Sequence, residues 1–192
     1  MSSIKLTADS GGGTFELKAP ASGSNARVLT VPDTASGTVL TTTNPKAGNI
    51  IQVVHANTGT QTTTSANSYT NSGLTASITP SSSSSKILVS VCQAYRLAIG
   101  GATAASGAIK IFREQGGTET AVSSPQDYFL YVEAAGTTSQ YVYDVMTQIV
   151  QDSPNTTSAV SYKTKQRIYN SMGTIITQYN GDSYITLMEI AA

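Results

Sequence analysis

The only histidine of the chain, His55, is the first residue whose type could serve catalysis or metal binding. It ends the apolar run 50–55, and no cysteine, aspartate or glutamate stands near it at the spacing of a metal site. No nucleophile accompanies it in the pattern of a catalytic triad. The pattern therefore favours a histidine that packs, or makes a hydrogen bond, at the end of a buried strand. We expect no metal site and no cofactor.

Paired carboxylates are the second arrangement that could do chemistry, because two of them can cleave a glycosidic bond. The acidic residues in the second half of the chain are few and scattered, and their spacing gives no reason to pair any two. A small glycan hydrolase is the activity that such a pair would support, but we expect a protein that is not an enzyme. The acidic residues concerned are Asp127, Glu133, Asp144, Asp152, Asp182 and Glu189.

Tyrosine is the main aromatic residue of this chain, which has ten tyrosines and no tryptophan. A tyrosine ring is rigid and apolar and carries a polar tip, which suits saccharides and protein interfaces. Tyr128 and Tyr131 fall on opposite faces of one predicted strand. Tyr141, Tyr143 and Tyr162 follow the apolar alternation of their strands, and we expect them in the core or in a contact between subunits.

Three basic residues, Lys163, Lys165 and Arg167, alternate along one predicted strand and therefore share one face. A solvated strand face is the ordinary interpretation, and attraction to an acidic polysaccharide is the functional one. Asn155 begins an Asn-Thr-Thr triplet that matches an N-glycosylation pattern. We interpret the triplet as chance because no secretory signal accompanies it. No individual residue is identified as a binding residue.

The composition of the chain is poor in charge. Charged residues make up 11% of the 192 residues, and eleven basic residues balance eleven acidic ones. A neutral chain lacks the basic footprint that nucleic-acid binding needs. Serine, threonine and glycine take the place of the missing charges, which is typical of fibres and of extracellular sheets.

One cysteine, Cys92, lies in the apolar run 86–95. A lone thiol makes no internal disulfide, and we expect it to be a small buried hydrophobe. The first residues lack the apolar core of a secretory signal, and no apolar run approaches the ~20 residues of a membrane helix. We therefore expect synthesis in a cytoplasm and no insertion into a membrane.

Residues 1–46 are predicted to form an N-terminal β-repeat segment, with short strands about ten to twelve residues apart. Each strand offers few apolar side chains, too few to offset the ~1–2 kcal/mol per residue that ordering a backbone costs. The segment is therefore expected not to fold alone: it lies against another surface, or copies of it intertwine. The residues 44–48 read as a linker. The predicted strands are Ile4–Thr7, Thr14–Lys18, Arg27–Val31 and Gly37–Thr41.

Residues 47–192 are predicted to form a β-sandwich with no helix, because strand-like runs and turn signals alternate throughout. The run Lys86–Tyr95 is apolar on both faces, which predicts a central strand. Gly116-Gly117 and Asn180-Gly181 each separate two β-runs, which predicts two hairpins. The other strand-like runs are Ile50–His55, Leu74–Thr79, Ala108–Arg113, Thr118–Val122, Asp127–Val132, Gln140–Val150, Ser158–Tyr169, Gly173–Tyr179 and Ser183–Ala192.

The phrases SIKLTADSGGGTFELKAP and ARVLTVPDTASGTVLTT near the start of the chain resemble the N-terminal repeats of virion appendage proteins of tailed bacteriophages. In those proteins a glycine-rich turn is followed, in order, by phrases like ELKAP, LTLPD and GTVLTT. The runs IIQVVH, GLTASITPS, SKILV and ITLMEIAA are similar to the C-terminal domain of tail-fibre type. The resemblance covers nearly the whole chain and includes no invariant catalytic residue.

The resemblance implies a structural protein on the virion surface, a homotrimer with a jelly-roll-like β-sandwich that attaches to the host as a tail fibre or spike. The N-terminal segment would bind a phage tail or capsid protein, or intertwine about the threefold axis. Because host-recognition fibres are usually much longer, a capsid decoration protein or head fibre is the main alternative. A virion-borne glycan hydrolase is a lesser alternative, and a monomeric cellular carbohydrate-binding module is a third class. Host surface polysaccharide is a candidate partner.

Overall fold

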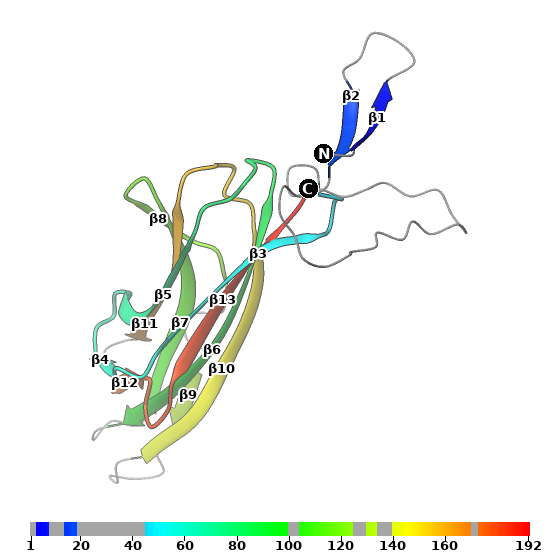
Figure 1. Ribbon diagram of the computed structural model, residues 1–192. Coiled ribbons are helices and arrows are strands. Elements are labelled where there is room, and N and C mark those ends of the chain that lie inside the picture. The colour runs from blue at the N-terminus through cyan, green and yellow to red at the C-terminus, as the bar shows by residue number, and fades with distance from the viewer. Residues whose placement is uncertain are drawn as a thin grey trace. The chain divides into compact units, whose positions relative to one another are not determined.

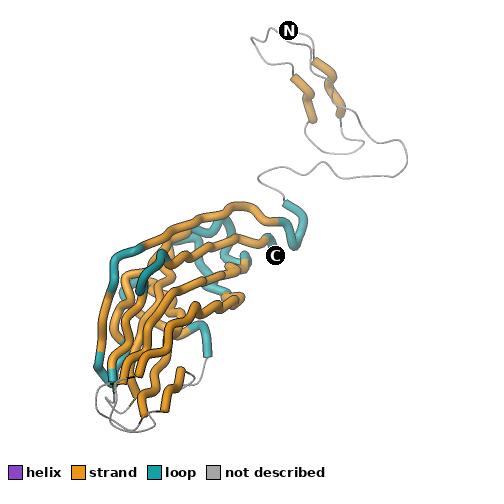
Figure 2. The backbone as a smooth tube through the Cα atoms, turned by 90° about the horizontal axis from the view of Figure 1, so that it is seen from below, coloured by secondary structure: helices purple, strands orange, loops and turns teal. Residues whose placement is uncertain are grey.

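The structure, a computed structural model, describes residues 3–7, 14–18, 45–99, 104–124, 130–133, 140–169 and 173–192. Every regular element in these ranges is a β-strand, and Figure 2 shows the strands joined by loops. The prediction of an all-β protein is confirmed. The same ranges contain no helix that could span a membrane. The chain divides into two units, Met1–Val39 and Leu40–Ala192.

In the first unit, two short strands form an antiparallel pair. β1 (Ser3–Thr7) pairs with β2 (Thr14–Lys18) along its whole length, and both strands lie where the sequence predicts them. The other two predicted strands, Arg27–Val31 and Gly37–Thr41, lie outside the described residues. The expectation that this segment needs a neighbouring surface or sister copies stays a prediction.

The second unit contains two antiparallel sheets that pack face to face as a β-sandwich (Figure 1). The first sheet, which we call the β6 sheet, is built on its longest strand. β6 pairs with β10 along one edge and with β13 and then β12 along the other, and β3 and β4 lie beyond these two. Its strands are β3 (Ile50–Thr58), β4 (Thr62–Thr64), β6 (Lys86–Ile99), β10 (Gln140–Asp152), β12 (Thr174–Thr177) and β13 (Ser183–Ile190).

The second sheet, which we call the β7 sheet, follows the order β5–β11–β7–β8, and β9 also pairs with β7. Successive long strands alternate between the two sheets, so neighbours within one sheet are distant in the sequence. The fold therefore depends on long-range pairing. The strands of this sheet are β5 (Thr70–Ile78), β7 (Ala104–Gln115), β8 (Thr118–Ala121), β9 (Leu130–Glu133) and β11 (Val160–Tyr169).

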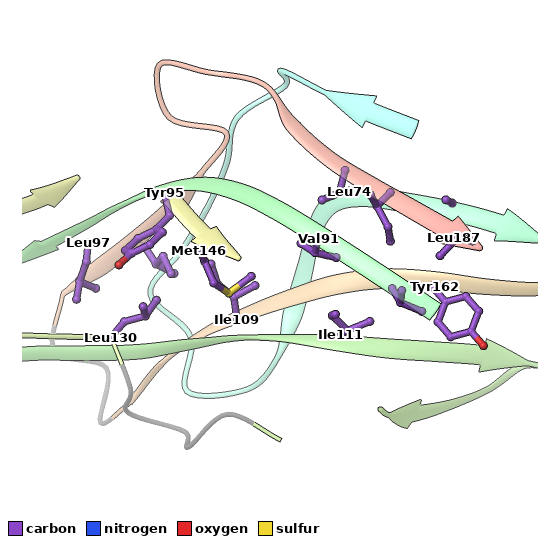
Figure 3. Close-up of a cluster of buried hydrophobic side chains, with 14 of the residues drawn as sticks. Leu74, Val91, Tyr95, Leu97, Ile109, Ile111, Leu130, Met146, Tyr162 and Leu187 are labelled. Carbon is purple, nitrogen blue, oxygen red and sulfur yellow. The ribbon is translucent and has the colours of Figure 1, made fainter. Parts of the chain in front are cut away.

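The hydrophobic core lies between the two sheets. Figure 3 shows Val91 and Tyr95 of β6 facing Ile109 and Ile111 of β7, with Met146 of β10 beside them. Alternate residues of each strand point into this layer because strand side chains alternate between faces. Each large aliphatic side chain that is fully buried stabilises the fold by about 1.5–3 kcal/mol.

A cluster of polar side chains crosses the middle of this core. The side-chain amide of Gln93 on β6 donates to the hydroxyl of Ser72 on β5 (3.0 Å), and that hydroxyl also bonds the hydroxyl of Thr164 on β11. All three residues are fully buried. A buried polar group without a partner costs about 1–3 kcal/mol, so these bonds favour one alignment of β6 over the β7 sheet.

β6 is the central strand, as predicted, because both of its edges are paired. Ile87, Val89 and Val91 are completely buried on its inner face. The prediction that Cys92 is a buried hydrophobe is wrong, because the cysteine is exposed on the opposite face. A two-layer sandwich covers only one face of each sheet. Because β6 is apolar on both faces, its sequence alone does not reveal which face is covered.

The hairpin at Gly116-Gly117 is confirmed. β7 and β8 pair through Gln115 and Thr118, so the two glycines form a two-residue turn. Their φ angles are 57° and 80°, and a type I′ turn requires positive φ at both of its central positions. Glycine adopts this region without the steric penalty that a Cβ atom brings.

The predicted hairpin at Asn180-Gly181 is wrong, although both of its strands exist. β12 and β13 do not pair with each other, and both run antiparallel to β6, one after the other along the same edge. Thr177 lies opposite Tyr95 and Tyr184 lies opposite Cys92, so residues 179–182 leave the ladder as a loop. The β6 strand, at fourteen residues, is long enough to pair with both.

Hydrogen bonds keep the ladder continuous across this loop. The amide of Gln178 donates to the carbonyl of Ala94 (2.8 Å), and the amide of Ala94 donates to the hydroxyl of Ser183 (3.1 Å). Asn180 has a φ of 55°, but Gly181 does not have a positive φ, so the predicted two-residue turn, which requires positive φ at both positions, does not form. Residues 179–182 form a loop that leaves a nearly continuous strand and returns to it, as in a large bulge.

Val89→Asp is expected to prevent folding, because a buried carboxylate without a partner costs several kcal/mol. Circular dichroism and thermal unfolding of the purified chain measure this. The matched control is Ser90→Asp, whose side chain lies on the opposite, half-exposed face of β6 and which should remain folded. A Val89→Asp protein that melts at the wild-type temperature would show that the core is placed wrongly.

Candidate functional site

The basic residues predicted to share a strand face do so on the outer face of the β7 sheet. Lys163, Lys165 and Arg167 alternate along β11 with residues that are fully buried. Two of them lie opposite β7 residues that also point outward: Lys163 pairs with Phe112 and Lys165 with Lys110. Basic and aromatic side chains of the two strands therefore interleave on one surface.

Aromatic rings hold the cations of this surface in place. The Lys165 ammonium lies 5.2 Å from the centre of the Phe112 ring, and the Lys110 ammonium lies 5.4 Å from that of Tyr69. The Arg167 guanidinium lies 5.3 Å from the Tyr69 ring and 5.6 Å from the Tyr169 ring. These distances fall within the range of cation–π attraction. We call this surface, made of Tyr69, Lys110, Phe112, Lys163, Lys165, Arg167 and Tyr169, the basic–aromatic face.

Two glutamates at one side of the face are paired with its lysines. Lys163 bonds Glu114 and also Glu119 (3.2 Å), and Lys165 bonds Glu119 (2.6 Å). Hydrogen bonds from Lys165 and Lys163 hold the pKa of Glu119 below its ordinary value, and the hydrogen bond to Glu114 raises the pKa of Lys163. Glu114 and Glu119 thus hold the ammonium groups of Lys163 and Lys165 at one side of the basic–aromatic face.

The arrangement offers the groups that bind an acidic saccharide. A guanidinium or ammonium group binds carboxylate, sulfate or phosphate, and an aromatic ring packs against the apolar face of a sugar. The sequence revealed the three basic residues of β11 but missed Tyr69, Lys110 and Phe112. Lys110 and Phe112 come from β7, whose register with β11 brings them to this surface, and Tyr69 comes from the segment before β5.

The predicted tyrosine positions divide between the inside and the outside of the sandwich. Tyr162 is fully buried in the core, as expected, whereas Tyr141 and Tyr143 expose 50% and 56% of their surface. The core interpretation of these two is therefore wrong, and the contact between subunits stays a prediction. Tyr131 is exposed on β9, and Tyr128 lies outside the described residues.

His55 lies on an edge strand, and the expected buried strand around it is wrong. β3 pairs with β13 alone, and Ile50 and Val53 expose more than half of their surface. The His55 Nδ1 atom lies 3.0 Å from the Thr186 hydroxyl, and its ring stacks on Tyr184 at 5.8 Å. Among the described residues, no three His, Cys, Asp or Glu side chains gather closely enough to hold a metal.

The candidate carboxylates have separate partners. Asp152 forms an ion pair with Arg113 (2.8 Å) and accepts a hydrogen bond from the Tyr162 hydroxyl (2.8 Å). Burial, together with that bond, raises the pKa of Tyr162. Asp182 accepts a hydrogen bond from Asn57 (3.4 Å). Asp144 and Glu133 lie on β10 and β9, and Asp127 lies outside the described residues.

Glu189 is a buried structural acid that joins three segments of the sandwich. It is fully buried on β13 and accepts hydrogen bonds from the Gln52 side chain (2.6 Å) and from the amide and hydroxyl of Ser81 (2.7 Å each). Burial by itself raises the pKa of Glu189, but the hydrogen bonds from Gln52 and Ser81 outweigh burial and hold it below the usual 4.5. The Glu189 carboxylate therefore stays ionised at a pH at which a buried carboxylate without hydrogen bonds would be protonated.

Sequence comparison identifies no relative from which a role could be transferred to these residues. No protein-family model and no curated protein matches the chain. The basic–aromatic face is therefore identified as the candidate binding site from its own chemistry. Two paired strands and the segment before β5 bring four cations and three rings to one surface.

Glu189→Gln is expected to lower the free energy of unfolding by about 1.5–3 kcal/mol at neutral pH, the worth of a hydrogen bond to a charged group. Because the folded pKa lies below the unfolded one, the stabilisation is complete above about 4.5 and is lost as the pH falls through the folded pKa. Urea unfolding from neutral to acidic pH measures both effects. The control is Asp182→Asn, which removes an exposed carboxylate. Equal acid sensitivity of the wild type and Glu189→Gln would contradict the assignment.

Proposed function

We propose that this protein is a short, trimeric surface protein of a tailed-phage virion, of tail-fibre or spike type, whose β-sandwich attaches to acidic polysaccharide on the host surface. The observation that carries the attachment is the basic–aromatic face. The virion and the trimer come from the resemblance of the sequence to phage appendage proteins.

The distribution of charge supports attraction of an acidic ligand. The chain as a whole is neutral, yet its basic–aromatic face gathers four cationic side chains, those of Lys110, Lys163, Lys165 and Arg167, on two neighbouring strands. Such a surface raises the local concentration of a polyanion and speeds its encounter. Because exposed charges are screened over about 10 Å at 0.1 M salt, the attraction should weaken as salt rises.

The fixed geometry of the side chains supports binding beyond simple charge attraction. The cations of Lys110, Lys165 and Arg167 lie against aromatic rings, so part of their conformational freedom is already lost before a ligand arrives. A side chain that is ordered in advance spares the roughly 0.5–1.5 kcal/mol that immobilising it on binding would cost.

The topology supports the jelly-roll interpretation of the sandwich. Four long strands follow the order β3–β13–β6–β10 in one sheet, and the other sheet follows β5–β11–β7–β8. Chain-consecutive long strands alternate between the sheets, and the first lies beside the last. A jelly roll has eight strands in two such sheets, and it is used by viral capsid proteins and lectins.

Attachment by weak sites requires several of them. We call the β-sandwich, residues 47–192, the head of the chain. In the proposed trimer, three such heads would present three basic–aromatic faces, so that binding of one face raises the effective concentration of the others. Residues 1–46 are proposed to hold the trimer to a tail or capsid protein. The head would then be the distal, ligand-binding part of the appendage.

The chain is expected to bind an acidic polysaccharide, such as polygalacturonate or dextran sulfate, and not neutral dextran, in affinity electrophoresis at low salt. Lys110→Gln with Arg167→Gln should weaken this binding about tenfold, since each exposed charge pair contributes up to about 1 kcal/mol. Tyr69→Ala should weaken it without changing the net charge.

The matched control is Lys46→Gln with Lys86→Gln, which removes the same charge outside the basic–aromatic face. If the control variant weakens polysaccharide binding equally, the attraction depends on the net charge of the chain and not on the basic–aromatic face. Binding of dextran as tightly as of the two anionic polymers would contradict the proposal. Release of new reducing ends from host polysaccharide would instead support a glycan hydrolase.

Deletion of residues 1–43 is expected to leave a folded head that binds acidic polysaccharide but does not attach to the virion. Thermal unfolding and polysaccharide binding test the head, and co-sedimentation with particles tests attachment. Decoration of virions by the truncated protein would contradict the role given to the N-terminal segment.

Electron microscopy of particles that carry the full chain shows where on the virion the protein lies. Density on the tail is expected, and density on the capsid lattice would identify a head fibre or capsid decoration protein.

A further inference from the structure

The outer face of the β6 sheet is apolar where it crosses β10. Tyr143, Val145 and Ile149 alternate along this strand and expose 56%, 53% and 65% of their surface, and Tyr141 continues the row. β10 lies at the edge of the sheet beside β6 (Figure 1). Exposed side chains of this size in one row are unusual for a surface that faces water alone.

The apolar surface continues across the neighbouring strands. In register, Gln151 of β10 is followed by Leu88 of β6, Met188 of β13 and Val53 of β3. Two rows along, Thr147 is followed by Cys92 and Tyr184, and the row between them runs from Ile149 through Ser90 and Thr186 to His55. We call this surface the apolar face; its exposed apolar members are Val53, Tyr141, Tyr143, Val145, Ile149 and Tyr184.

The apolar face has almost no charge. The outward positions of β3, β6, β10 and β13 include no carboxylate. Their one arginine, Arg96, lies 5.1 Å from the ring of Tyr141 and 4.4 Å from that of Tyr179, and Tyr143 packs beside both rings. A second outward cation, Lys86, lies near the opposite end of β6, so the middle of the face has no charge, and tyrosine and arginine are among the residues most enriched in binding hot spots.

The area of the apolar face suits a contact between two proteins. Three half-exposed tyrosines leave about 300 Å² in contact with water, and the three exposed aliphatic side chains add roughly 200 Å². Since about 65% of a homodimer interface is apolar, this amount corresponds to about 800 Å² per partner, which is the size of a standard interface.

We infer that the apolar face packs against a second copy of this chain. This inference deepens the proposed function, on whose self-association it rests, by assigning the surface through which the heads meet. The contact buries Val145 and Ile149 of β10 and leaves the basic–aromatic face, on the opposite sheet, open to the medium.

Two observations favour a second copy over other occupants. A saccharide needs converging polar groups, whereas the most exposed row of the face, on β10, presents the aliphatic side chains of Val145 and Ile149. A strand added to the edge of β10 would need its free amides, but the Val145 amide donates to the Asp144 carboxylate (2.7 Å). A charge at this position protects an edge strand from pairing, so the contact is made by the face and not by the edge.

Sedimentation equilibrium of the full chain at micromolar concentration tests the inference. The wild type should have a mass that is a multiple of 19.9 kDa. Val145→Lys with Ile149→Lys should weaken self-association on the order of 100-fold, because each copy would bury two unpaired charges against like charges. Both residues are exposed in one chain, so the variant should unfold at the wild-type temperature.

The matched control is Ser77→Lys with Thr118→Lys, which adds two lysines at exposed strand positions of the β7 sheet and should keep the wild-type mass. A monomeric wild type would overturn the inference. So would a variant that keeps the wild-type mass, because the contact would then lie elsewhere, for example in the N-terminal segment.

Cys92 gives a second readout that does not depend on mass. Its thiol is exposed on the apolar face of one chain, so a maleimide reagent should label it slowly in the assembled wild type and rapidly in the Val145→Lys, Ile149→Lys variant. Equal labelling rates would overturn the inference. Binding of polysaccharide by the variant, measured per chain, separates this outcome from failure of the proposed function: a monomer that still binds acidic polysaccharide keeps the ligand site and loses only the contact.

Discussion

The pleat of a β-strand gives it two faces, and a sandwich of two sheets can bury only one face of each. In this protein β6 is the strand on which the arrangement depends, because it is paired on both edges and its inner residues Val89 and Val91 are completely buried. A buried hydrogen bond from Gln93 to Ser72 favours one alignment of the sheets. Once the inner faces are used for the core, the two outer faces are left for other molecules.

The two outer faces differ in chemistry, and this difference carries the proposed function. The β7 sheet presents cations held against aromatic rings, with Arg167 beside Tyr69 as one example. The β6 sheet presents exposed aliphatic and tyrosine side chains such as Ile149 and Tyr143 at outward positions without a carboxylate. A surface of the first kind suits a hydrated, anionic ligand, and one of the second kind suits a packed protein contact. In an assembly that buries the second face, the first would point away from the neighbouring copies.

Alternation of apolar and polar residues predicted most strands of the head, because side chains alternate with a period of two and the core selects one face. Alternation did not predict which strands pair with each other. The Asn180-Gly181 pair predicts a local hairpin, yet β12 and β13 both pair with β6, since a long strand edge offers more hydrogen bonds than a local hairpin. Nor could alternation decide which apolar face is covered, which is why Cys92 was placed inside. The contacts of Tyr69 depend on register between strands, which a single sequence does not contain.

A structure of the assembled full chain, determined by electron cryo-microscopy, tests the central claim that the two outer faces have separate roles. The account predicts that Val145 and Ile149 on the β6 sheet are buried against a neighbouring copy, while Lys165 and Arg167 on the β7 sheet face solvent. An assembly that buries the basic–aromatic face between copies and leaves the apolar face open would contradict it.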